Sequence, residues 1–291
     1  MLEPVTGYLT SENLTVAGLG NVPPSLNPAV FVIFGLLIAW AVLFGLAYLV
    51  LAIISCVRQK LPLSDLLKRS FNSFKSLVRP MLRYYIPLMI LSFIVGIFLL
   101  IFNIMRIFTN LVPAGSMAMI VLLLVFIPVI VATSIYFAVL DNSLAKSYYN
   151  SLKARKFAFK WISFEELIRL IGLGLVYSII IIASLFLLGI PLLFLPAISL
   201  FLRFPLLNEG KGIGATISKL VSMLRKDFWN LFFFYFIYSL LIGFVSSFIQ
   251  YIPIIGYMAV MVVVVPFSTL LSAEAYYYLN KNYELAGKKP R

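Results

Sequence analysis

Residues 228–273 read FWNLFFFYFIYSLLIGFVSSFIQYIPIIGYMAVMVVVVPFSTLLSA and contain no charged residue over 46 positions. A helix needs about 20 apolar residues to cross the ~30 Å hydrocarbon core of a bilayer, so this stretch is long enough for two crossings. Pro253 and Gly256 lie near its middle. Because both residue types interrupt helices, the stretch predicts two helical spans, near 229–249 and 254–275.

The composition of the whole chain extends this interpretation. Of its 291 residues, 63% are hydrophobic and 11% are charged, whereas soluble domains carry about 25% charged residues. We therefore predict an all-α membrane protein with about seven transmembrane helices and with basic amphipathic interfacial helices on the cytoplasmic side. The expected parts are an extracellular tail over 1–28, a single polytopic membrane domain over 29–278 with spans near 29–55, 84–105, 117–140, 170–188, 190–203, 229–249 and 254–275, and a cytoplasmic basic tail over 279–291.

The distribution of Lys and Arg decides the number of crossings. Four segments, 58–83, 141–169, 203–227 and the chain from 274 onward, hold 22 of the 23 basic residues. Short basic loops lie on the cytoplasmic side of a membrane, so all four segments are expected there. Residues 170–202 carry no charge and must then cross twice, or dip and return as a re-entrant hairpin. This places a multi-pass chain in the cell membrane with its N-terminus outside and its C-terminus in the cytoplasm.

Three of the basic segments have the pattern of amphipathic helices. Apolar residues recur at helical spacing from Leu63 to Leu82 and from Ile217 to Phe228, with a rougher copy over 143–161. Such helices lie in the membrane interface and bind anionic headgroups, but a polyanion or an acidic partner protein would attract the same cations. The residues expected to make this contact are Lys68, Arg69, Lys75, Arg79, Lys153, Arg155, Lys156, Lys219, Arg225 and Lys226.

The sequence lacks the residues that most catalytic and metal sites require. It contains no histidine, and Cys56 is its one cysteine. A catalytic triad is therefore excluded, and the usual ligands of transition metals and haem are missing. We expect no catalytic residue, no metal, no cofactor and no enzymatic activity. The glycine-rich stretch 210–214 lacks the spacing of a phosphate-binding loop and is expected to be a flexible turn.

A few further residues are candidates for smaller roles. Asp141 and Glu274 are expected to snorkel from span ends toward the interface, and Asn13 begins a glycosylation sequon in the outside tail. Serine and threonine in spans usually bond to their own helix or to a neighbouring one. If a lumen exists, its expected lining is Ser246, Ser247, Gln250, Ser268, Thr269 and Ser272.

Two resemblances bear on function. The first resemblance depends on four features of the sequence. They are a span ending in Gly189-Ile190-Pro191, the stretch Phe204 to Gly212 (FPLLNEGKG), the following helix 215–224 and the ending Ala273 to Tyr278 (AEAYYY). In these features the chain resembles a broad, mainly archaeal and bacterial group of integral membrane proteins related to the membrane domain of some glycerophosphodiester phosphodiesterases. The phosphodiesterase catalytic domain has no counterpart here. In size, span number and basic inner face, the chain also resembles the membrane channel component of the crenarchaeal Ced DNA-import system.

These observations favour a non-enzymatic membrane subunit of a translocation assembly, with DNA import as the function that the resemblance implies. The expected partners are membrane lipids, small membrane proteins, DNA, a cytoplasmic ATPase and further copies of the chain. Two alternatives stay open. A secondary transporter would show broken helices that meet near the membrane midplane, and a membrane scaffold would bind lipids or partner proteins and move nothing.

Overall fold

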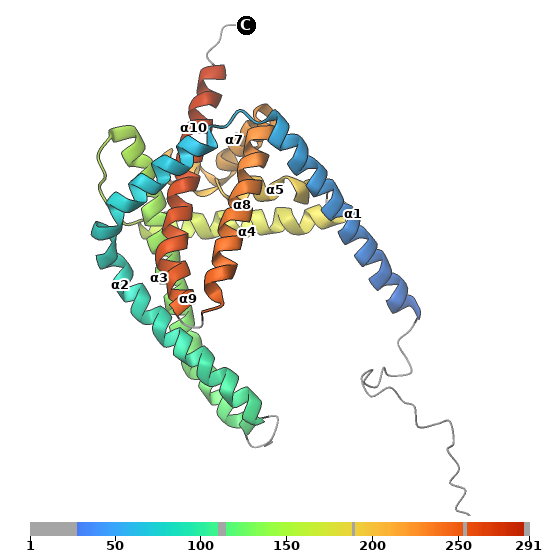
Figure 1. The fold of residues 1–291 in the computed structure, drawn as a ribbon, viewed down its shortest axis with the longest axis vertical. Helices are drawn as coiled ribbons and strands as arrows, with labels where there is room; N and C mark the ends of the chain where they lie inside the picture. Colours follow the sequence, from blue (N-terminus) through green and yellow to red (C-terminus); the bar gives the residue numbers. More distant parts are fainter. Residues whose placement is uncertain (1–27, 110–114, 188–189, 253–254, 288–291) are drawn as a thin grey trace, which may run out of the picture. The chain divides into compact units, whose positions relative to one another are not determined.

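A computed structural model describes residues 28–109, 115–187, 190–252 and 255–287 (Figure 1). These residues form helices, with no strand among them. Six of the described helices are long and apolar enough to cross a membrane. The chain is therefore an all-α membrane protein, as its composition predicts.

The chain divides into two compact units, Met1–Leu49 and Val50–Arg291. The described part of the first unit is the beginning of α1, Pro28–Arg58. Its large apolar side chains are mostly exposed, and Trp40 stacks on Phe44 with ring centroids 5.1 Å apart. A helix that is apolar on all sides belongs in lipid or in a large core.

In the second unit, α2 (Leu63–Thr109) and α3 (Gly115–Ala154) each combine a basic segment and an apolar span in one continuous helix. Pro80 lies inside α2 without ending it, and Figure 1 shows α2 changing direction along its course. The two helices pack against each other along the hairpin, where the Tyr136 hydroxyl donates to the backbone oxygen of Tyr84 at 2.9 Å.

The segment after α4 (Phe164–Phe186) differs from the expected fifth span. In place of one continuous span near 190–203, the chain forms a 3-10 turn η1 (Ile190–Leu193) and the short helices α5 (Leu195–Ser199) and α6 (Arg203–Asn208). Six residues of helix reach only about 9 Å, far less than a bilayer. Prolines enter this stretch repeatedly and remove the backbone donors that a continuous helix needs; they are Pro191, Pro196 and Pro205.

The chain then continues through five further elements. These are α7 (Ile213–Lys226), α8 (Phe228–Gln250), α9 (Ile255–Ala259), a π-helical stretch labelled η2 (Val260–Val264) and α10 (Val265–Gly287). Two long apolar segments thus flank the break that Pro253 and Gly256 predict. The expected C-terminal tail from 279 is helical as far as Gly287, where α10 ends.

The core of the second unit lies between the C-terminal halves of α3 and α10, the helix α6 and the first half of α8. Its largest fully buried side chains include Tyr149, Phe204 and Tyr276. The Phe204 ring stacks on Tyr276 with centroids 5.1 Å apart, and Tyr149 lies 5.4 Å from Tyr276. This core fixes the ends of the helices that carry the basic segments.

Candidate functional site

The four basic segments meet at one end of the second unit. We call this region the cationic end; it comprises the start of α2, the last turns of α3, the stretch 203–226 and the last turns of α10. Tyr148 of α3 is hydrogen-bonded to Glu274 of α10 at 2.7 Å and to Ser73 of α2 at 2.8 Å. The Tyr276 hydroxyl of α10 donates to Glu209, beside α7, at 2.9 Å. Contacts between residues far apart in sequence thus gather these segments.

Glu209 links α6, α7 and α10. Its carboxylate accepts hydrogen bonds from Lys219 at 2.6 and 2.7 Å, and Lys211 lies 3.5 Å away. Burial raises the pKa of Glu209, but the hydrogen bonds and charge of Lys219, with Tyr276 and Lys211, outweigh it and hold that pKa below its ordinary value. In the turn after Glu209, Gly210 adopts φ +64°, a conformation that L side chains rarely adopt.

Asp141 and Arg203 form a second link, between α3 and α6. Arg203 donates to the Asp141 carboxylate at 2.5 Å, and their side chains are 17% and 18% exposed. The Thr269 hydroxyl of α10 also donates to Asp141, and Arg203 lies 3.3 Å from the Ser272 hydroxyl. The expectation that Asp141 and Glu274 snorkel to water is wrong, because both carboxylates turn inward to protein donors.

Lys146 of α3 provides a third link. It donates to both oxygens of Glu166 at 2.6 and 2.8 Å. Glu166 also accepts from the backbone of Ser163 at 2.8 Å, and the Ser163 hydroxyl accepts from the backbone of Glu166 at 3.2 Å. These two hydrogen bonds form a reciprocal capping box at the start of α4.

These links leave most of the predicted contact cations without an acidic partner. Lys219 is the exception, since its side chain is 8% exposed and paired with Glu209. The other nine are exposed, and within the described part of the chain none forms an ion pair. They are Lys68, Arg69, Lys75, Arg79, Lys153, Arg155, Lys156, Arg225 and Lys226.

Two of these cations lie over aromatic rings at the cationic end. The Lys153 ammonium is 4.7 Å from the ring centroid of Tyr149, and the Lys226 ammonium is 4.4 Å from that of Tyr283. An exposed cation–π contact contributes about 0.5–1 kcal/mol. It orients the side chain and leaves its charge available to an anion.

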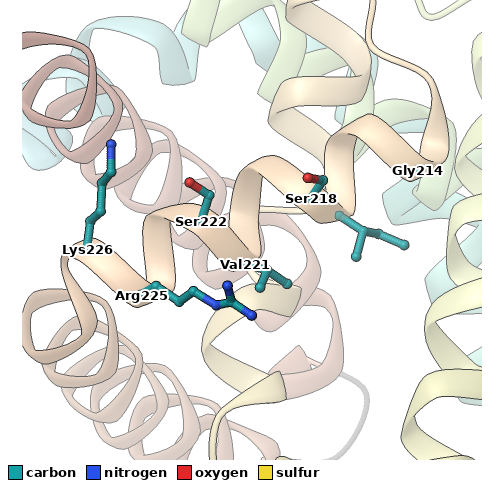
Figure 2. Close-up of a pocket in the computed structure, with 7 residues that line it drawn as sticks. Gly214, Ser218, Val221, Ser222, Arg225 and Lys226 are labelled. Carbon is teal, nitrogen blue, oxygen red and sulfur yellow. The ribbon is translucent and has the colours of Figure 1, made fainter. Parts of the chain in front are cut away.

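The surface of α7 forms a hollow of about 510 Å³. Figure 2 shows Arg225 and Lys226 on the last turns of the helix and two serine hydroxyls on the turns before them. The hollow thus combines two cations, two hydroxyls and apolar surface. Its lining is Gly214, Ile217, Ser218, Val221, Ser222, Arg225 and Lys226.

A second hollow, of about 410 Å³, lies between the start of α2 and the end of α10. Arg69 and Lys281 contribute positive charge to it, and Asp65 and Glu274 contribute carboxylates. Glu274 is 5% exposed and is held by Tyr148 at 2.7 Å. The charges of this hollow are mixed, whereas those of the α7 hollow are purely positive.

The residues proposed to line a lumen divide into two places. Ser268, Thr269 and Ser272 are buried, and Thr269 and Ser272 lie beside Asp141 and Arg203. Ser246 is half-buried and Ser247 is exposed on α8. Ser268 lies close to Tyr238 of α8. Ser246 is eight residues further along α8 than Tyr238, which is about 12 Å at a rise of 1.5 Å per residue. The side chain of Gln250 and all of Asn13 lie outside the described residues.

The sequence identified the individual cations but missed the acidic residues that organise them. Their pairing could have been sought, because the chain has only ten acidic residues and eight of them lie within the four basic segments. Among the described residues, no group of three or more His, Cys, Asp or Glu is placed to hold a metal ion. Comparisons with protein-family models, curated proteins and solved structures give no match to this chain.

Proposed function

We propose that the chain is a non-enzymatic integral membrane subunit of a translocation assembly, and that its cationic end binds the phosphates of DNA. The observation that carries the proposal is the set of nine exposed cations at that end, which have no ion-pair partner in the described part of the chain. When Lys and Arg bind the phosphates of DNA, the counterions of the DNA are released, and this release drives the association of the protein with DNA. A cytoplasmic ATPase and small membrane proteins are the partners that such an assembly would require.

The test uses the full chain in vesicles of zwitterionic lipid. Each phosphate of such a lipid is balanced by the positive group of its own headgroup, so DNA is the only molecule added that carries unbalanced phosphates. The affinity for duplex DNA is measured from 50 to 200 mM salt. The logarithm of the binding constant falls with the logarithm of salt by about 0.9 per phosphate contact. The double variant Arg225→Gln/Lys226→Gln is expected to weaken binding and to reduce this slope by about 1.8 if both cations contact phosphates.

A matched control removes a cation that already has a partner. Arg169 is paired with Glu165 at 2.5 Å on the exposed first turns of α4. The variant Glu165→Gln/Arg169→Gln keeps the net charge and is expected to leave both the affinity and the slope unchanged. Absence of DNA binding at 50 mM salt, or the same slope with and without Arg225 and Lys226, overturns the proposal.

A membrane scaffold held by anionic lipid headgroups is the second candidate. The α7 hollow favours it, because Ile217 and Val221 lie beside Arg225 and Lys226, and an interfacial helix offers this combination of apolar and cationic groups. Each cation near an anionic surface contributes about 1 kcal/mol. If anionic lipid raises the Tm of the chain, and Arg225→Gln/Lys226→Gln removes that increase while DNA fails to bind, the scaffold function is favoured.

The secondary-transporter alternative has less support. The chain does contain broken helices, at η2 (Val260–Val264) and at α5 and α6. The expected polar lining is split, however, since Ser268 turns toward the interior of the protein and Ser247 is exposed on α8. These positions supply no common polar site at the centre of the bundle.

A further inference from the structure

The course of α4 sets it apart from the other long helices of the second unit. In Figure 1, α4 runs across the direction of α3, α8 and α10. Its first turn is fixed at the cationic end by the Lys146–Glu166 pair at 2.6 Å. Eleven residues later the Tyr177 hydroxyl donates to the backbone oxygen of Leu195 in α5. At 1.5 Å per residue these two points are about 17 Å apart along the helix.

The second point adjoins the cationic end, because α5 packs against α7 as well as against α8. Phe194, next to Leu195, has its ring centroid 5.4 Å from that of Phe228, the first residue of α8 after the basic helix α7. Between the two points, a Cβ on Gly172 would lie 3.2 Å from Ile213, the first residue of α7. A helix that left the cationic end along the membrane normal would lose these contacts after its first turns.

The two faces of α4 have different surroundings. Leu173, Tyr177 and Ser184 are buried against the protein. The opposite face is an exposed apolar stripe at helical spacing, with exposed fractions from 52% to 85% and no charge after Arg169. A continuous apolar surface of this kind is a contact site. The stripe consists of Ile168, Ile171, Leu175, Ile179, Ile182 and Phe186.

We infer that α4 lies along the membrane surface at the cationic end, with this stripe in the hydrocarbon of the bilayer, and does not cross it. Its length and composition would allow a crossing, but its contacts keep it at one end of the unit. The lipid is the occupant of the stripe, because the stripe carries no polar group that a water-exposed partner surface would need. This inference does not depend on the proposed function.

The inference also removes a difficulty in the topology. The basic segments 141–169 and 203–227 lie on one side whether the chain between them crosses twice or not at all. Two crossings would need a span near 190–203, where η1, α5 and α6 are each too short. The alternative without a crossing requires only that α4 lies in the plane of the membrane. The same rule for Lys and Arg is then satisfied by the helices that the structure contains.

Depth measurements test this inference directly. Single cysteines replace Ile168, Leu175 or Ile182 in a Cys56→Ser background and are spin-labelled. In lipid vesicles, the rate at which each label collides with oxygen is compared with its rate of collision with a water-soluble nickel chelate. An in-plane helix predicts high oxygen contact and the same depth, within about 5 Å, at all three positions. A crossing helix would change depth by about 21 Å between positions 168 and 182, which would overturn the inference.

Labels on α8 provide the matched control. Leu240 and Phe248 are exposed on that helix, and their depths should differ by about 12 Å if α8 runs along the membrane normal. Low contact with both probes on α4 would mean that protein covers the stripe, which would contradict the lipid assignment. If one labelled variant fails to fold, Ile171 and Ile179 lie on the same stripe and must report the same depth.

Discussion

Arg203 of α6 donates a hydrogen bond of 2.5 Å to Asp141 of α3, which lies 62 positions earlier in the chain. The Thr269 hydroxyl of α10 also donates to Asp141, so the pair and this hydrogen bond together connect three helices. Breaking a buried pair by removing one partner typically costs about 3–5 kcal/mol, because an uncompensated charge remains. The partial exposure of both side chains, 17% and 18%, puts this pair at the lower end of that range.

The first prediction concerns this pair. Asp141→Asn is expected to lower the free energy of unfolding by about 3 kcal/mol, measured by denaturant unfolding in mild detergent. The double variant Asp141→Asn/Arg203→Met should lose less than the sum of the two single changes, because no unpaired charge is left. Glu165→Gln, which breaks the exposed pair with Arg169, is the control and should cost at most about 1 kcal/mol. Additive losses in the double variant would show that the two residues act independently.

The second prediction concerns pH. The folded pKa of Glu209 is lower than its ordinary value of 4.5, so its carboxylate stabilises the fold when ionised. That contribution is fully present above pH 4.5 and is lost as the pH falls through the lowered folded pKa. The Tm of the wild-type chain should therefore fall more steeply below pH 4.5 than the Tm of Glu209→Gln.

Other carboxylates titrate in both proteins, so the difference between the two curves isolates Glu209. At neutral pH the variant should already be less stable, because Lys219 is left without its partner. Parallel curves between pH 6 and pH 3 would contradict the role of the Glu209–Lys219 pair.

The third prediction concerns the start of α4. Ser163→Ala removes the hydroxyl that accepts from the backbone of Glu166, and the loss of such a cap costs about 1 kcal/mol. Ser178→Ala is a matched control, since Ser178 is exposed and its hydroxyl donates to the oxygen of Gly174 within the same helix. Equal effects of the two substitutions on the free energy of unfolding would argue against the cap.

The sequence predicted the fold class and the local features of the chain from short-range patterns. Uncharged stretches indicated where long apolar helices lie, such as the two on either side of Pro253 and Gly256. The structure divides the expected span near 190–203 into short helices, which the charge rule could not indicate because it specifies only which side a segment lies on. A chain that never crosses satisfies the rule as well as one that crosses twice, and the prolines at 191, 196 and 205 favour short helices.

The candidate site was less predictable, because it depends on contacts between distant residues. Lys219 has the same pattern in the sequence as Arg225 and Lys226, yet it is buried against Glu209 while they are exposed. Similarly, Thr269 and Ser272 read as mild polar residues in a span, and only their position beside Arg203 shows that they help to hold an ion pair. Side-chain periodicity carries no information about such partners.

We expect the four basic segments to share one side of the membrane. The most direct test of this expectation is labelling with a membrane-impermeant thiol reagent in sealed vesicles, with Lys153→Cys and Arg225→Cys made separately in the Cys56→Ser background. Both cysteines should react from the same side, and neither should react from the other side until the vesicles are opened. Reaction of Lys153→Cys from one side and of Arg225→Cys from the opposite side would contradict it.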